Sequence, residues 1–171
     1  MNEQVKPDEI VELLRQAYAM EVEAADCYYD LSDQMFAGNN PDVANIFSHL
    51  ADIEGRHADE IEGRLKALGH NAAGGSYSWD DPLGPESTAS EDIHYLMTPY
   101  HALQLALHNE KRAAEFFRML ADKSSEAEAR ALALEYAGEE DEHVKLVEEW
   151  LTRVDEPAVD WHDDEDPAVG Q

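Results

Sequence analysis

The chain contains the same helical pattern twice, and this repeat limits the folds that it can form. One segment returns 86 residues later, as Glu54-x-x-His57-x-x-x-Ile61-x-x-x-Leu65 and Glu140-x-x-His143-x-x-x-Val147-x-x-x-Leu151. A second pair of segments also matches, as Glu21-x-x-Ala24-x-x-Cys27-Tyr28-x-x-Leu31 and Glu110-x-x-Ala113-x-x-Phe116-Phe117-x-x-Leu120. The sequence therefore predicts two copies of one helical hairpin, which together make an all-α, antiparallel four-helix bundle.

Apolar side chains at helical spacing, together with turn and capping residues, predict where the helices begin and end. The predicted helices cover residues 8–37, 41–68, 99–122 and 125–154, with a short helical turn at 90–97. Asn40 before Pro41 is predicted to cap the second helix, and Ser125 with Glu128 forms a capping box for the fourth. The Gly- and Pro-rich stretch 70–90 is too long for a tight turn, so it predicts a long crossover connection between the hairpins.

The charge of the chain limits its partners. Its 171 residues include 12 basic and 39 acidic ones, a formal net charge of −27. This charge repels nucleic acid and anionic membrane surfaces, so we expect neither as a partner, whereas cations are favoured. Most of the carboxylates are expected only to keep the surface solvated. Residues 155–171 contain seven acidic and no basic residues, and we interpret them as an acidic mobile tail after a domain of residues 1–154.

Cysteine content and hydropathy predict the compartment. Cys27 is the single cysteine, so we expect neither an internal disulfide nor a site built from Cys-x-x-Cys pairs. No run approaches the roughly 20 apolar residues of a membrane span. The first ten residues also lack the pattern of a secretory signal. We therefore expect a cytoplasmic protein.

The spacing of the repeated motif has a chemical consequence. Residues three apart lie on one helix face about one turn apart, so a Glu-x-x-His can bind one ion with both side chains. Apolar residues one or two turns away place both motifs on buried stripes: Leu50, Ile61, Tyr136 and Val147. Glu21 and Glu110 lie on similarly apolar faces. Four glutamates are therefore predicted to meet in one core.

Four ionised carboxylates in a core would each cost several kcal/mol unless cations neutralised them. Two divalent cations among four glutamates and two neutral histidines make a neutral cluster, the pattern of di-iron and di-manganese bundles. Oxygen and imidazole donors without sulfur favour iron or manganese, and zinc also fits. The sequence thus predicts a centre of two iron ions, with manganese or zinc as alternatives, and six ligands: Glu21, Glu54, His57, Glu110, Glu140 and His143.

Each part of this pattern also has a simpler reading. A single Glu-x-x-His is frequent by chance in an acidic helical protein, but two in register with a repeated glutamate are not. The other histidines have no partner at chelating spacing, so we expect surface or ordinary core roles for His49, His70, His94, His101, His108 and His162. Tyr28, seven residues after Glu21 on the same face, is predicted to hydrogen-bond a ligand, to act as a radical sink, or only to pack in the core.

Over residues 10–152 the sequence resembles the ferritin-like di-iron superfamily, most closely its rubrerythrin-like branch. The motifs that carry the resemblance are Ala19-Met20-Glu21-x-x-Ala24-x-x-Cys27-Tyr28-x-x-Leu31 and Phe47-x-x-Leu50-Ala51-x-x-Glu54-x-x-His57-Ala58. The resemblance implies the same six ligands, with Glu54 and Glu140 as bridging carboxylates. Two departures are visible: Leu107 stands where rubrerythrins have an additional glutamate, and no rubredoxin-like domain with paired Cys-x-x-Cys is present.

The resemblance also implies an activity, that of a di-iron oxidoreductase of the ferroxidase or peroxidase type. Such a protein would oxidise Fe(II) with peroxide or O2. Without a rubredoxin-like domain, electrons are expected from Fe(II) itself or from an external donor protein, and we expect a homodimer or larger homo-oligomer. Two alternatives stay open: a metal-binding or metal-buffering bundle without turnover, and an interaction module that uses the acidic tail and segment 69–98.

Overall fold

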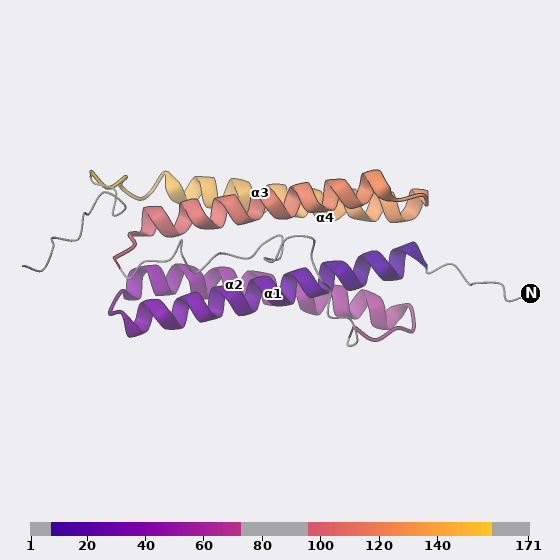
Figure 1. Ribbon diagram of the computed structural model, residues 1–171, viewed down its shortest axis with the longest axis horizontal. Coiled ribbons are helices and arrows are strands. Elements are labelled where there is room, and N and C mark those ends of the chain that lie inside the picture. Colours follow the sequence, from indigo (N-terminus) through magenta and orange to yellow (C-terminus); the bar gives the residue numbers. More distant parts are fainter. Residues whose placement is uncertain (1–7, 73–95, 159–171) are drawn as a thin grey trace, which may run out of the picture.

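Four helices make up the part of the chain that the computed structural model describes, residues 8–72 and 96–158. They are α1 (Glu9–Ala37), α2 (Pro41–Ala67), α3 (Pro99–Lys123) and α4 (Ala127–Leu151). The described residues form no strand. α1 packs against α2 and α3 packs against α4, as two hairpins side by side (Figure 1). The predicted fold, an all-α bundle of two repeated helical hairpins, is confirmed.

Two contacts at opposite ends of the bundle fix the direction of the helices. Asn40, in the α1–α2 turn, donates from Nδ2 to the carbonyl oxygen of Met97, 2.7 Å away and just before α3. Ser125, in the α3–α4 turn, donates from its backbone nitrogen to Glu9 Oε2, 2.9 Å away at the start of α1. α2 and α3 therefore run in the same direction, and the end of α2 lies at the opposite end of the bundle from the start of α3 (Figure 1).

Several predicted features fall on residues that the structure does not describe. Residues 73–95 include most of the crossover connection and most of the helical turn predicted at 90–97. Residues 159–171 include most of the predicted acidic tail. Within the described residues, no helix has the length and apolar character that a membrane span requires.

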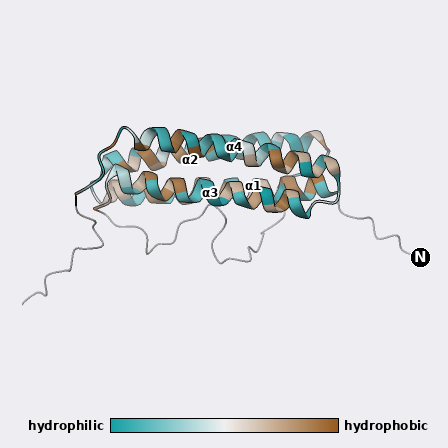
Figure 2. Cartoon of the chain, turned by 90° about the horizontal axis from the view of Figure 1, so that it is seen from above, coloured by the Kyte–Doolittle hydropathy of each residue, from teal (hydrophilic) through white to brown (hydrophobic). Residues whose placement is uncertain are grey.

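The core consists of two apolar clusters, one towards each end of the bundle. The first includes Leu14, Phe117 and Tyr136, and the second includes Tyr28 and Phe47. Hydrophilic and hydrophobic residues alternate along each helix in Figure 2, as expected for helices that bury one face. Between the two clusters the stripes continue through polar residues, and there the predicted ligands lie.

One of the two cap predictions is confirmed in position and the other is wrong. Asn40 is the N-cap residue of α2 and Pro41 follows it, as predicted, but the Asn40 side chain makes no cap hydrogen bond and donates to Met97 instead. The Ser125–Glu128 capping box does not form, because the residue that caps α4 is Glu126. Glu9 of α1 replaces the box: its Oε2 accepts from the backbone nitrogens of Ser125 and Glu126 at 2.9 and 3.0 Å. A contact distant in sequence thus satisfies donors that were expected to be satisfied locally.

This difference can be measured. Because Glu9 accepts two otherwise unpaired backbone donors, Glu9→Ala should cost about 1 kcal/mol, the usual cost of losing a helix cap. For a chain of this size that lowers the melting temperature by roughly 2–4 °C. Glu128→Ala, which would disrupt the predicted capping box, should leave the melting temperature almost unchanged. A larger loss in Glu128→Ala than in Glu9→Ala would contradict the observed cap.

Candidate metal centre

The structure brings the six predicted ligands together from all four helices. Three overlapping groups could each hold a metal ion, with every donor atom of a group within 4.8 Å of the others. The groups are Glu54, His57 and His143; Glu21, His57 and Glu140; and Glu110, Glu140 and His143. Each predicted ligand belongs to at least one group. The repeated motifs therefore converge on one point of the bundle.

The carboxylates of this centre lie in the core and the histidines lie at its edge. None of Glu21, Glu54, Glu110 and Glu140 is more than 1% exposed. The side chains of His57 and His143 are 21% and 14% exposed. The apolar residues one or two turns away from both motifs are buried as predicted. These ionisable side chains are therefore buried because they share the apolar face of their helices.

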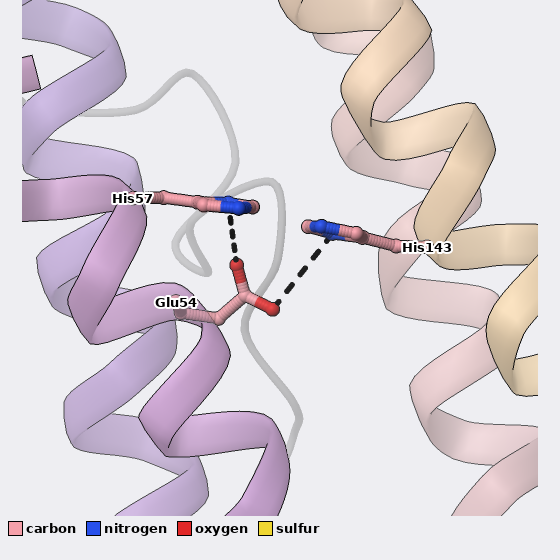
Figure 3. Close-up of side chains that lie close together, drawn as sticks. All are labelled: Glu54, His57 and His143. Atoms are coloured by element: carbon pink, nitrogen blue, oxygen red, sulfur yellow. Dashed lines mark ion pairs between the residues drawn. The ribbon is translucent and has the colours of Figure 1, made fainter. Parts of the chain in front are cut away.

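Glu54 lies between the two histidines (Figure 3). Its Oε2 is 3.6 Å from His57 Nδ1, and its Oε1 is 3.9 Å from His143 Nδ1. Each oxygen thus faces one half of the centre. Glu140 is placed similarly, since it lies 3.1 Å from His143 Nδ1 and also belongs to the group with Glu21 and His57. Both carboxylates can therefore serve two ions, which is the arrangement that bridging ligands need.

Several buried carboxylate oxygens have no hydrogen-bond partner among the described residues, which tests whether cations fit the site. Among the described residues, no hydrogen bond reaches Glu21 Oε2, either oxygen of Glu54, Glu110 Oε1 or Glu140 Oε2. The ion-pair partners that the described residues offer these glutamates are His57 and His143. A buried acceptor without a partner costs about 1–3 kcal/mol, and more when it is charged. Two divalent cations would satisfy these oxygens, so the donor set fits a two-metal centre.

The electrostatics of the centre without metal favour bound protons. Burial raises the pKa of Glu21 well above its usual value, and the charges of Glu140 and Glu54 add to the effect. Burial likewise raises the pKa of Glu110 and Glu140. Burial alone would lower the pKa of His143, but the hydrogen bond with Glu110 and the nearby carboxylate of Glu140 outweigh it and raise the value to about 11. Metal binding must therefore displace protons.

Tyr28 is fully buried beside the centre. Its ring stacks on Phe47 with centroids 6.1 Å apart. Its hydroxyl oxygen accepts a hydrogen bond from Asn109 Nδ2 at 3.4 Å, and Asn109 precedes Glu110. Asn109, 1% exposed, escaped the sequence analysis, although an asparagine beside a predicted ligand on a buried stripe was a usable signal. The predicted roles of Tyr28 in hydrogen bonding or radical chemistry stay predictions.

The other described histidines lie outside the three groups. The His49 ring lies 5.3 Å from that of Trp150, with the two planes tilted by 45°. His108 is exposed, and His101 Nδ1 accepts from the backbone nitrogen of Thr98 at 3.2 Å. His70 follows α2, and its backbone nitrogen donates to the carbonyl oxygen of Leu65. His94 and His162 fall outside the described residues.

We therefore predict that His108→Ala and His101→Ala keep the metal content of the parent protein. His101→Ala should still lower the melting temperature slightly, because it removes an acceptor at the start of α3. Elemental analysis of both purified variants checks this. Loss of metal in either one would mean that the site on α3 is misplaced.

Comparisons with known proteins agree with this geometry. The family profile described as Rubrerythrin matches residues 12–151. A search among curated proteins finds no match. Among solved structures, the chain is similar to an uncharacterised conserved protein from Magnetospirillum magnetotacticum MS-1, with 38% sequence identity and a TM-score of 0.65. The similarity covers 88% of this chain and 99% of that one.

Proposed function

Because this chain belongs to the rubrerythrin family, we propose that it holds two iron ions and uses them to oxidise Fe(II) with peroxide or O2. The observation that supports this proposal is the set of unpartnered carboxylate oxygens at a point where all four helices meet. Iron held by these residues would supply two electrons, one from each ion, which with two protons would reduce one H2O2 to two molecules of water.

The residues of the chain have separate roles in this proposal. Glu21 and Glu110 would each serve one ion, and Glu54 and Glu140 would bridge both. His57 and His143 complete the donor set from the two sides. Carboxylate oxygens favour the higher charge of Fe(III), which helps the oxidation.

The test begins with anaerobic loading of the metal-free protein with Fe(II). We expect two iron ions per chain by elemental analysis. Adding one equivalent of H2O2 should then oxidise both ions, with growth of near-ultraviolet absorption from oxo- or carboxylate-bridged Fe(III). Exposure to air should give the same Fe(III) product. The rates of oxidation by O2 and by H2O2 then show which oxidant the site prefers.

Two results would contradict the proposal in different ways. Binding of two ions without oxidation by either oxidant would favour a metal-binding or metal-buffering bundle. Binding of no iron would reject the centre itself. Cytoplasmic location, homo-oligomerisation and an external electron donor are further parts of the proposal, and each needs its own measurement.

A further inference from the structure

The two hairpins differ around their histidines, and the repeat makes the difference visible. Each α2 position corresponds to the α4 position 86 residues later. Around His57 the side chains are polar: Glu60, Arg64, Tyr136 and Glu139. The equivalent positions around His143 are apolar: Leu146, Trp150, Leu50 and Ile53. A purely structural requirement would act on both hairpins alike, so the polar side needs an explanation of its own.

Contacts between α2 and α4 support this equivalence. On the His57 side, Arg64 Nη2 lies 2.7 Å from Glu135 Oε1. The equivalent positions on the His143 side are Trp150 and His49, whose rings lie 5.3 Å apart. The same two positions therefore meet on both sides, once as an ion pair and once as a ring pair. The difference between the sides is one of chemistry and not of backbone placement.

The polar side contains a small pocket between α2 and α4. It is lined by His57, Glu60, Ile61, Arg64, Tyr136 and Glu139. The pocket has no room for a water molecule as the side chains lie. His57 is the only one of the six proposed ligands in its lining, and it is 21% exposed, so the His57 side chain connects this polar surface with the centre. On the opposite side, Leu50 and Ile53 are only 2% and 8% exposed and pack into the core. The centre is thus approached by polar groups from one side.

Tyr136 adds an independent observation that points to a polar guest. The residue lines the pocket and is 3% exposed, and its hydroxyl has no hydrogen-bond partner among the described residues. An unpaired buried hydroxyl costs about 1–3 kcal/mol. The equivalent residue Leu50 fills its place without that cost. The hydroxyl is therefore understandable if a polar species occupies the pocket at some stage.

The charges of the pocket select a cation. Glu135 neutralises Arg64, which leaves the carboxylates of Glu60 and Glu139 beside His57. Carboxylate and phenol oxygens are hard donors that suit a divalent first-row metal, whereas a neutral oxidant gains nothing from two negative charges. The net charge of −27 attracts the same cations from solution.

We propose that divalent iron reaches the centre through this pocket when its side chains move apart, with Glu60, Glu139 and the Tyr136 hydroxyl as transient ligands and with the His143 side closed. The Arg64–Glu135 pair lies over the route, since the Arg64 guanidinium is 5.3 Å from the centroid of the Tyr136 ring. This inference rests on the proposed two-metal centre, because a route without a destination has no function.

The test compares how fast and how far the metal-free protein takes up Co(II), a coloured ion that O2 does not oxidise at such sites. Stopped-flow absorbance gives the rate and equilibrium titration gives the number of ions. Glu60→Gln/Glu139→Gln should load at least threefold more slowly than the parent, because clefts of one charge raise cation on-rates by 10-fold or more. The parent and the Glu60→Gln/Glu139→Gln variant should each bind two ions per chain at equilibrium. Tyr136→Phe, which removes only the hydroxyl, should also load more slowly.

A control variant separates the pocket from the overall charge. Asp59→Asn/Glu128→Gln changes the net charge equally, on the same two helices, at exposed residues that do not line the pocket. It should load at the parent rate. Loading of the parent should also slow with added salt more than loading of the pocket variant, since salt screens the attraction that the variant has already lost.

Each other outcome overturns the proposal in its own way. Parent-like loading of the pocket variant would show that iron enters elsewhere. Equal slowing in the control would assign the effect to net charge alone. Loss of an ion at equilibrium would make Glu60 or Glu139 a permanent ligand and not part of a route. Failure of the parent to bind two ions would reject the centre and the route together.

Discussion

Replacing Glu54 or Glu140 by alanine should lower the bound iron from two ions per chain to one or none. The reason is geometric: the two oxygens of Glu54 face His57 and His143, one each, and Glu140 belongs to a ligand group on either side. A carboxylate that serves two ions affects both when it is lost. Its removal also leaves the remaining positive charge less well neutralised in a core that is poor in water. Elemental analysis of each purified variant measures the result.

A matched control for these variants lies on α4, the helix of Glu140. Glu142 is two residues from Glu140, is 70% exposed and pairs with Lys145. Glu142→Ala should therefore keep two ions. Circular dichroism of all three variants should show unchanged helix content, because no buried apolar contact is removed. Two ions in Glu54→Ala or in Glu140→Ala would disprove the bridging role of that residue.

Features that depend on spacing within one helix were predictable from the sequence. The burial of Glu21, Glu54, Glu110 and Glu140 follows from the apolar residues that flank each one at helical spacing. The meeting of the four helices at one point follows from the repeat, because equivalent residues of two similar hairpins come to equivalent places. The direction of α3 followed from the length of the connection before it.

Features that depend on contacts between helices were not predictable in this way. Local pattern favoured a Ser125–Glu128 capping box, but the tertiary contact with Glu9 supplies the acceptor for α4. Similarly, the Asn40 side chain donates a hydrogen bond to the carbonyl oxygen of Met97 instead of capping α2. The pocket beside His57 could not be predicted from the sequence, because Tyr136 resembles a core residue when only its hydrophobicity and spacing are considered. Comparing the repeats at polar positions, as well as at the ligands, would have revealed the asymmetry.

Removing the metal should lower the melting temperature near neutral pH, and the difference should grow as pH rises. A ligand that binds only the folded state stabilises it by about 2.7 kcal/mol when free metal is at 100 times its dissociation constant. In a chain of this size that corresponds to roughly 5–10 °C. The metal-free protein loses this contribution and must also keep four carboxylates in one core, either as repelling anions or with bound protons.

The pH dependence of the metal-free protein follows from the direction of its pKa shifts. Burial raises the pKa of Glu21, Glu110 and Glu140, so each binds protons in the folded state that it has released in the unfolded chain. The pKa of His143 rises from 6.5 to about 11 through its contacts with Glu110 and Glu140, and has the same sign. Where the folded state binds more protons, stability falls as pH increases. The His143 contribution is complete below about 6.5, its unfolded value, and is lost as pH rises towards 11.

The loaded protein should change in the opposite direction. Metal keeps the glutamates and histidines deprotonated, so the unfolded chain binds more protons and stability is lost as pH falls through the ordinary pKa of histidine, about 6.5. Thermal melts of both forms from about pH 5 to 8, followed by circular dichroism, should therefore give curves that converge towards acid and separate towards neutral pH. Protein that is stripped of metal with a chelator and then reloaded should regain the melting temperatures of the loaded form. If both forms melt together over the whole range, the six residues do not share metal ions in the folded state, because metal that binds there must compete with these protons.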